Sequence, residues 1–127
     1  MPKERVRLLK SGELSEEEIH KTIMRWVRLQ PAIARYVLHF PNEGRRSPRY
    51  GKLLKDLGMR PGVSDLFIPL ARKGYIGAWI ELKTPKGIVT ALQKEFLMDM
   101  EQQGHYTAIC RSIEDGIKTI GWYCTSN

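Results

Sequence analysis

Two carboxylates and a lysine gather in the central part of this 127-residue chain. Glu81 and Lys83 stand two positions apart in the otherwise apolar run 78–83 (AWIELK), so a β-strand there turns both side chains to one face. Asp65 begins a second apolar run, 65–70 (DLFIPL). Carboxylates at adjacent strand ends suit a hard divalent cation, and a nearby ammonium group can handle an attacking water. The pattern predicts the outline of a phosphodiester-hydrolysing site, because that reaction needs charge neutralisation on the phosphate oxygens.

The Glu-x-Lys pattern also has a second interpretation, which the residues alone leave open. In an amphipathic strand of a basic protein, Glu81 and Lys83 can simply form cross-strand ion pairs. Asp65 would then be an ordinary polar residue at the start of a strand. The surrounding elements and the charge of the chain therefore bear on the choice.

The segments around these residues predict one α/β domain, a mixed central sheet flanked by helices. The two apolar runs read as a hairpin, because a short turn around residues 72–74 joins them. The expected order is α-β-(α)-β-β-α-β-α. In chain order we expect a helix at about 15–29, a strand at 36–40, a helix at 50–57, strands at 65–70 and 78–83, a helix at 89–103, a strand at 106–111 and a short helix at 112–118.

The first expected helix carries a carboxylate on its inward face. Ser15 and Glu18 have the spacing of a capping box, so the helix begins there. Glu16 lies seven residues before the apolar Ile23 and so shares its buried face, whereas Glu17 points to water. A shift in the helix register would exchange these two roles, and the sequence leaves that alternative open.

The overall charge favours a polyanionic partner. The chain has 21 Lys and Arg against 14 Asp and Glu, a net charge of +7, so nucleic acid is the first candidate and a basic protein without such a partner is the alternative. Basic residues crowd the segment 1–14 and the middle of the chain. We expect Arg45, Arg46 and Arg49, in a turn-forming loop, to grip phosphates, with a merely solvated loop as the alternative.

Composition also excludes several classes of protein. With 42% hydrophobic and 28% charged residues, the chain is neither disordered nor fibrous. It has no apolar run near the ~18 residues that a membrane span needs and no signal-peptide core, so we expect a cytoplasmic protein without a membrane partner. Cys110 and Cys124 are too few for a disulfide framework or a zinc site, and both are expected to be reduced.

Three segments resemble the VRR-NUC domain, a family of the PD-(D/E)xK nuclease superfamily: GVSDLFIP at 62–69, GAWIELK at 77–83 and Gln93 at the start of a helix. The loop Asn42-Glu43-Gly44, the segment Gly104-His-Tyr and the first helix extend the resemblance over roughly residues 15–120. The compact form is similar to the stand-alone members found in bacteriophages. The resemblance thus implies a nuclease domain at 15–127, preceded by a basic segment at 1–14.

The resemblance assigns roles to particular residues. Asp65, Glu81 and the backbone carbonyl of Leu82 would ligate Mg²⁺ or Mn²⁺, and Lys83 would orient or activate water. Glu16 would complete the metal shell directly or through water. Gln93 would stand near the catalytic site, although a capping box with Thr90 is the alternative reason for its presence.

The sequence departs from the family pattern at two places. His20 stands where the family often has glutamine in the first helix, and Ser64 replaces the proline that precedes the superfamily's aspartate. Neither change removes an expected metal ligand, so an active enzyme is expected. His20 fits a packed or solvated histidine better than a catalytic one. Glu43 fits equally a group behind the metal ligands and a simple turn residue.

These expectations combine into a functional hypothesis. The chain resembles a metal-dependent DNA endonuclease that cuts branched DNA, as Holliday-junction resolvases do, and a homodimer would supply the two sites that paired cutting needs. One alternative is a catalytically inactive basic module that binds DNA or RNA. Others are a flap-cutting or nicking enzyme and a restriction-type nuclease of the same superfamily. For a phage-encoded protein, the compartment would be the host cytoplasm.

Overall fold

Four short strands form one mixed sheet at the centre of the molecule. The computed structural model describes residues 13–40 and 48–126. The sheet order is β1-β2-β3-β4, with β1/β2 and β2/β3 antiparallel and β3/β4 parallel. Along the chain the elements are α1 (Glu16–Arg28), the 3₁₀ turn η1 (Ala34–Tyr36), β1 (Leu38–His39), α2 (Pro48–Asp56), β2 (Leu66–Ile68), β3 (Ala78–Leu82), α3 (Ala91–Gln102), β4 (Tyr106–Cys110) and α4 (Ile113–Cys124).

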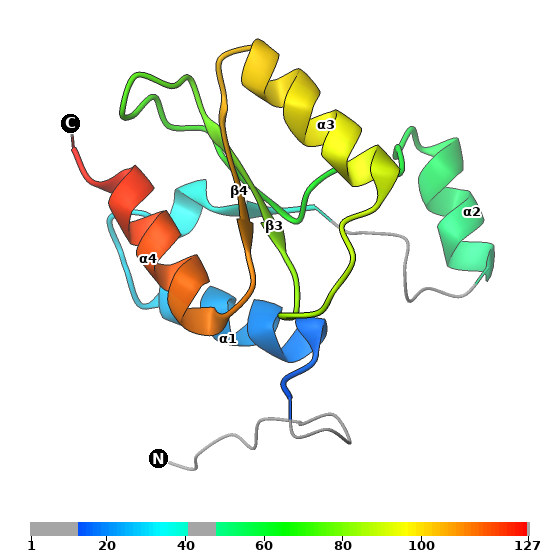
Figure 1. Ribbon diagram of the computed structural model, residues 1–127, viewed down its shortest axis with the longest axis horizontal. Helices are drawn as coiled ribbons and strands as arrows, with labels where there is room; N and C mark the ends of the chain where they lie inside the picture. The colour runs from blue at the N-terminus through cyan, green and yellow to red at the C-terminus, as the bar shows by residue number, and fades with distance from the viewer. Residues whose placement is uncertain (1–12, 41–47, 127) are drawn as a thin grey trace.

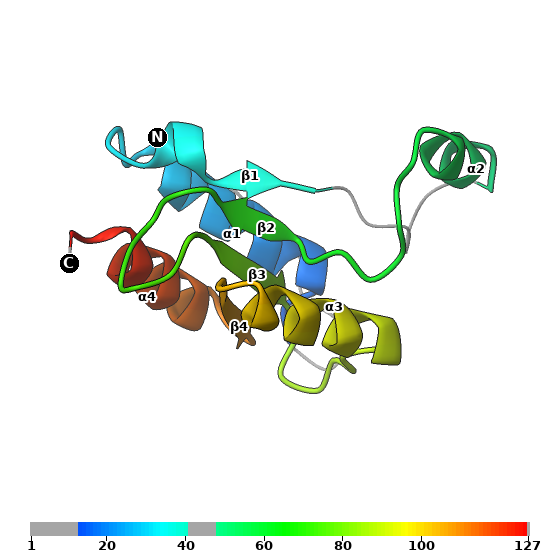
Figure 2. The ribbon, with the colours of Figure 1, turned by 90° about the horizontal axis from the view of Figure 1, so that it is seen from above.

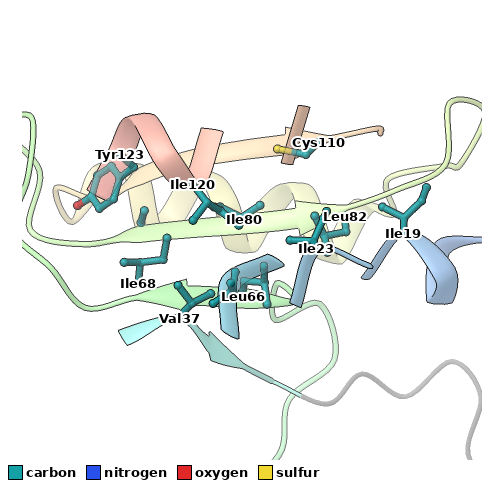
Figure 3. Close-up of a cluster of buried hydrophobic side chains, with 12 residues drawn as sticks. Ile19, Ile23, Val37, Leu66, Ile68, Ile80, Leu82, Cys110, Ile120 and Tyr123 are labelled. Carbon is teal, nitrogen blue, oxygen red and sulfur yellow. The ribbon is translucent and has the colours of Figure 1, made fainter. Parts of the chain in front are cut away.

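Helices cover both faces of the sheet. Figure 1 shows α3 and α4 on opposite sides of β3 and β4. Alternate residues of β3 explain the arrangement, since Ile80 and Leu82 face the core shared with α1 and α4, while Trp79 meets Phe96 of α3 edge to face at 4.8 Å. The larger apolar core therefore lies on the α1/α4 side of the sheet. Figure 3 shows its buried side chains, among them Ile19, Ile23, Leu66, Ile120 and Tyr123.

The predicted fold class and element order are confirmed, but several elements differ in length, and the strand expected at 65–70 is shortened to β2. The strand expected at 36–40 is reduced to β1, because the chain still forms the 3₁₀ turn η1 just before it. The closing helix, expected to end at residue 118, continues to Cys124. It continues because Ile120 and Tyr123 extend its buried face, and the Tyr123 hydroxyl donates a hydrogen bond of 2.6 Å to the Leu70 carbonyl.

The hairpin between β2 and β3 is also confirmed. Arg72 and Tyr75 pair across a two-residue turn, in which Lys73 and Gly74 have φ angles of 56° and 84°. Two positive φ angles in succession give the twist that matches the right-handed twist of the flanking strands. This tight turn fixes the register of the hairpin, and with it the pairing of the residues at the open end.

Helix α2 stands apart from the sheet. Figures 1 and 2 show it at one extremity of the molecule. None of its residues is buried, and Tyr50 and Leu53, with Leu57 directly after the helix, are exposed. No helix in the described ranges is long and apolar enough to cross a membrane.

The contact between α1 and α4 depends on a glycine. A Cβ atom added at Gly116 would lie 2.4 Å from Cδ1 and 3.3 Å from Cγ1 of Ile23, which is fully buried. The two helices thus approach so closely that no side chain fits at Gly116. At Gly121, five residues further along α4, the nearest atom to an added Cβ is 3.9 Å away, on Trp26.

These two glycines give a matched test of the packing. Gly116→Ala should destabilise the protein by about 1–2 kcal/mol, because overpacking a core costs more than the helix propensity gained from alanine. Gly121→Ala should be neutral or stabilising by up to about 1 kcal/mol, since only the propensity changes. Urea unfolding of both variants measures the difference, and equal stabilities would contradict the close approach of the helices.

Candidate metal centre

Three carboxyl groups from three parts of the chain converge beside the open end of the hairpin. Glu16, Asp65 and Glu81 each offer an oxygen, and these oxygens lie within 4.8 Å of one another. Asp65 and Glu81 are buried, with 2% and 1% of their surface exposed, and Glu16 is half-buried. Oxygens that coordinate one cation at about 2.0–2.6 Å are separated by up to about 5 Å, so the cluster has the dimensions of a shared site.

The register of the hairpin brings Asp65 and Glu81 together. Leu66 pairs with Ile80, and one further step along the antiparallel ladder sets Asp65 opposite Glu81. Asp65 also accepts a hydrogen bond of 2.7 Å at Oδ2 from the Leu82 amide. Because the N–H and C=O of an extended residue point to the same side of a strand, the Leu82 carbonyl faces the side where Asp65 lies.

Lys83 follows Glu81 on the same face, directly after β3. Its side chain is buried with 7% exposure, and its backbone N–H donates to the Cys110 carbonyl at 2.9 Å, which continues the pairing with β4. The ammonium group is close enough to Glu81 that its charge acts to lower the pKa of that carboxyl. The structure thus places the one predicted lysine beside the predicted carboxylates.

The helical phase of α1 places Glu16, and not Glu17, in the cluster. The Ser15 hydroxyl accepts a hydrogen bond of 3.1 Å from the Glu18 amide and fixes where the helix begins. Glu17 is exposed and forms an ion pair of 3.0 Å with Lys21, one turn further along. The shifted register that the sequence left open is therefore not the one that this helix adopts.

Gln93 connects the cluster to the start of α3. Its side-chain oxygen Oε1 accepts a hydrogen bond from the backbone N–H of Thr90 at 2.9 Å. Its backbone N–H donates to the Thr90 hydroxyl at 3.2 Å, so the predicted capping box is formed. The Nε2 atom of the same side chain donates to Oε2 of Glu81 at 3.4 Å. The capping role of Gln93 and its place near the catalytic site are therefore compatible. The side-chain oxygen serves the helix cap, and the side-chain nitrogen contacts the Glu81 carboxylate.

His20 lies near this cluster, beside a second histidine, His39. His20 packs edge to face on His39 at 4.4 Å, and His39 Nδ1 lies 3.2 Å from the Asp65 carbonyl. Burial, followed by the charge of His39, lowers the pKa of His20, and Asp65 acts in the opposite direction. His39 was not selected from the sequence, because nothing in the short run around it marks it as a neighbour of Asp65.

Arg49 is exposed in the first turn of α2, the helix that Figures 1 and 2 show at one extremity of the molecule, apart from the sheet. Arg45, Arg46 and Glu43 fall outside the described residues, as does most of the basic segment 1–14. Ser64, the residue before Asp65, is fully buried, and its hydroxyl has no hydrogen-bond partner among the described residues. The structure thus brings together the acidic residues, Lys83 and Gln93, but not the arginine it describes.

Glu81 is the member of the cluster whose ionisation is disfavoured by its surroundings. Burial, hydrogen bonding to Asp65 and the charge of Asp65 raise its pKa to about 9. Its Oε1 atom is buried and has no hydrogen-bond partner within the described part of the chain. A hard divalent cation would neutralise the carboxyl groups and coordinate such an oxygen, so the donor set fits Mg²⁺ or Mn²⁺.

Comparison with known proteins agrees with this chemistry. The family model of the VRR-NUC domain matches residues 14–114, a range that contains Glu16, Asp65, Glu81, Lys83 and Gln93. A solved structure described as a VRR_NUC domain protein is similar to this chain with a TM-score of 0.74 and 27% sequence identity, over 87% of this chain and 88% of the other. No curated protein matches the chain significantly.

The raised pKa of Glu81 predicts how the stability of the metal-free protein depends on pH. A carboxyl group with a pKa of 4.5 when unfolded and about 9 when folded keeps its proton in the folded state between these values. Unfolding then releases a proton, so the free energy of unfolding falls as pH rises, by at most about 1.4 kcal/mol per pH unit. We expect thermal stability in EDTA to decline from pH 5 to 9, with a smaller decline in Glu81→Gln.

Glu17→Gln is the matched control, because Glu17 is exposed, and it should retain the slope of the unmodified chain. Added Mg²⁺ should stabilise the unmodified chain more at pH 9 than at pH 5, since the cation displaces the proton. Parallel curves for the unmodified chain and Glu81→Gln in EDTA would show that Glu81 is already ionised.

Proposed function

The chain belongs to the VRR-NUC family, a family of PD-(D/E)xK-type nucleases, and from this premise we propose that it is a divalent-metal-dependent DNA endonuclease. The observation that carries the proposal is the convergence of Glu16, Asp65 and Glu81 within 4.8 Å. Lys83 lies beside them on the face of Glu81. The hydrolysed bond is the phosphodiester of the DNA backbone.

Each residue of the cluster has a task in this proposal. Asp65, Glu81 and the Leu82 carbonyl hold Mg²⁺ or Mn²⁺, and Glu16 completes the set directly or through water. When bound, the cation supplies charge neutralisation to the scissile phosphate and favours deprotonation of the attacking water. Lys83 donates hydrogen bonds from Nζ and orients the water against the phosphorus. Gln93 keeps the Glu81 carboxylate in place through its Nε2 contact.

The charge balance argues against a purely structural ion pair. A structural pair would match one carboxylate to one ammonium, whereas three carboxyl groups share the neighbourhood of Lys83. Burying Asp65 and Glu81 side by side costs folding free energy. A site that binds a cation gives such an arrangement a function, and an inactive DNA-binding module would have no use for it.

The preferred substrate belongs to the proposal as well. We expect branched DNA such as a Holliday junction, cut by a homodimer whose two sites open on one basic face. Arg45, Arg46 and Arg49 would contact phosphates there, as part of the net charge of +7. Flap cutting, nicking and base-specific cutting of the restriction type are the competing activities.

Substitutions in the cluster test the catalytic roles. Asp65→Asn and Glu81→Gln should abolish cleavage with Mg²⁺ or Mn²⁺, and Lys83→Met should lower kcat on the order of 10²–10³-fold, because each variant loses a cation ligand or the charged donor. Glu16→Gln should reduce activity by about 10- to 100-fold, as loss of a water-mediated or peripheral ligand does. Single-turnover cleavage of labelled DNA measures each rate.

Glu17→Gln is the control for Glu16→Gln, because it makes the same change one residue away on the exposed face. It should cut at the rate of the unmodified chain. Full activity of a folded Asp65→Asn or Glu81→Gln variant would contradict the assignment. A larger loss in Glu17→Gln than in Glu16→Gln would show that Glu17, and not Glu16, is the helix carboxylate that serves the site.

Substrate choice and assembly are tested together. The purified chain should cut a four-way junction faster than flap, linear double-stranded or single-stranded DNA in Mn²⁺, and not at all in EDTA. Light scattering should give a mass near twice the 14.7 kDa of the chain. A strictly monomeric particle that nicks the junction on one strand only would replace the resolvase proposal with nicking or flap cutting.

A further inference from the structure

Arg111, the residue directly after β4, reaches the loop that follows Lys83. Its Nη1 atom donates to the carbonyls of Thr84 at 2.9 Å, Gly87 at 2.8 Å and Pro85 at 3.3 Å. The Gly87 amide in turn donates to the Thr84 carbonyl at 3.0 Å, which closes the loop on itself. One guanidinium nitrogen thus gathers three carbonyls of a four-residue turn, here called the 84–87 loop.

The 84–87 loop connects two parts of the candidate metal centre. It begins directly after Lys83, and it leads to Thr90 and Gln93, whose side chain contacts Glu81. The loop also packs tightly, because a Cβ atom added at Gly87 would lie 3.0 Å from the Thr84 hydroxyl and 3.4 Å from Cβ of Lys83. The shape of this loop therefore constrains the base of the lysine side chain.

Sheet pairing stops where the loop begins. The last hydrogen bond between the β3 and β4 segments is the one from the Lys83 amide to the Cys110 carbonyl, so the carbonyls that follow need other donors. Arg111 supplies them from a fixed position. Its own amide lies 3.4 Å from the Asp115 carboxylate, in the first turn of α4, where Ser112 caps the helix through the Asp115 amide at 3.0 Å.

We propose that Arg111 is a positioning residue for Lys83, because its guanidinium fixes the 84–87 loop and thereby the direction of the lysine side chain. The inference rests on the proposed function, in which Lys83 orients the attacking water. Arginine suits this task, since its planar guanidinium stays charged and presents several N–H donors in a rigid arrangement. Arg111 acts here on the protein backbone and not on the DNA.

Kinetics separate this role from a phosphate contact. Arg111→Met keeps much of the length of the side chain but removes all donors, and it should lower kcat by about 10- to 100-fold with KM changed less than about twofold, as loss of a group that orients a catalytic residue does. Arg111→Lys, which retains a charged donor, should recover part of the loss. The salt dependence of DNA binding should stay that of the unmodified chain.

Lys118→Met is the matched control, because Lys118 is an exposed cation on α4 that pairs with Glu114 at 3.0 Å. It should leave kcat unchanged. A raised KM with unchanged kcat in Arg111→Met, together with a salt slope smaller by about one, would identify a phosphate contact and overturn the proposal. Unchanged kcat and KM would overturn it too.

Amide hydrogen exchange gives a readout that does not depend on activity. The Gly87 amide should exchange faster in Arg111→Met than in the unmodified chain or in Lys118→Met, because the loop loses its clamp. Unchanged exchange would overturn the proposal. If the unmodified chain cuts no DNA, the proposed function fails, and with it the catalytic meaning of Arg111, while Gly87 exchange still decides whether Arg111 holds the loop.

Discussion

Two carboxyl groups buried side by side are the constraint on which the rest of this molecule depends. Asp65 and Glu81 face each other across the hairpin with almost no exposure to water, and burial together with the charge of Asp65 disfavours ionisation of Glu81 and raises its pKa. The protein offsets part of this cost with the Leu82 amide on Asp65 and the Gln93 amide and Lys83 charge on Glu81. The part of the cost that is not offset would be relieved by a bound cation, and a metal-dependent nuclease needs a site of this kind.

The division of the sheet into two faces makes such a cluster tolerable. The side that packs on α1 and α4 carries Ala78, Ile80 and Leu82 of β3, and the opposite side carries Trp79, Glu81 and then Lys83. The larger apolar core therefore lies on the first side of the sheet, and the candidate metal centre lies at the end of the second side. Glu16 reaches the cluster from the first turn of α1, so the helix that closes the core also delivers the third carboxyl group.

Much of this arrangement follows from local patterns in the sequence. Alternation along a strand placed Glu81 and Lys83 on one face, and the seven-residue step back from Ile23 placed Glu16 inward. Other features depend on contacts between distant segments, which periodicity does not report. The last helix is expected from the sequence to end at residue 118, whereas α4 continues to Cys124, and Gly116 lies where Ile23 leaves no space for a side chain. His39 and Arg111 gain their meaning only once the chain has brought Asp65 and the 84–87 loop to them.

The amide of Gln93 has a consequence for communication within the protein. Because one rigid group both closes the first turn of α3 and contacts Glu81, any ligand that draws the carboxylate away also pulls on the helix cap. Occupancy of the centre and fraying of α3 are then thermodynamically linked, and each changes the equilibrium of the other by the same free energy. The order of the first turn of α3 therefore depends on the charge state of Glu81, through the side chain of Gln93.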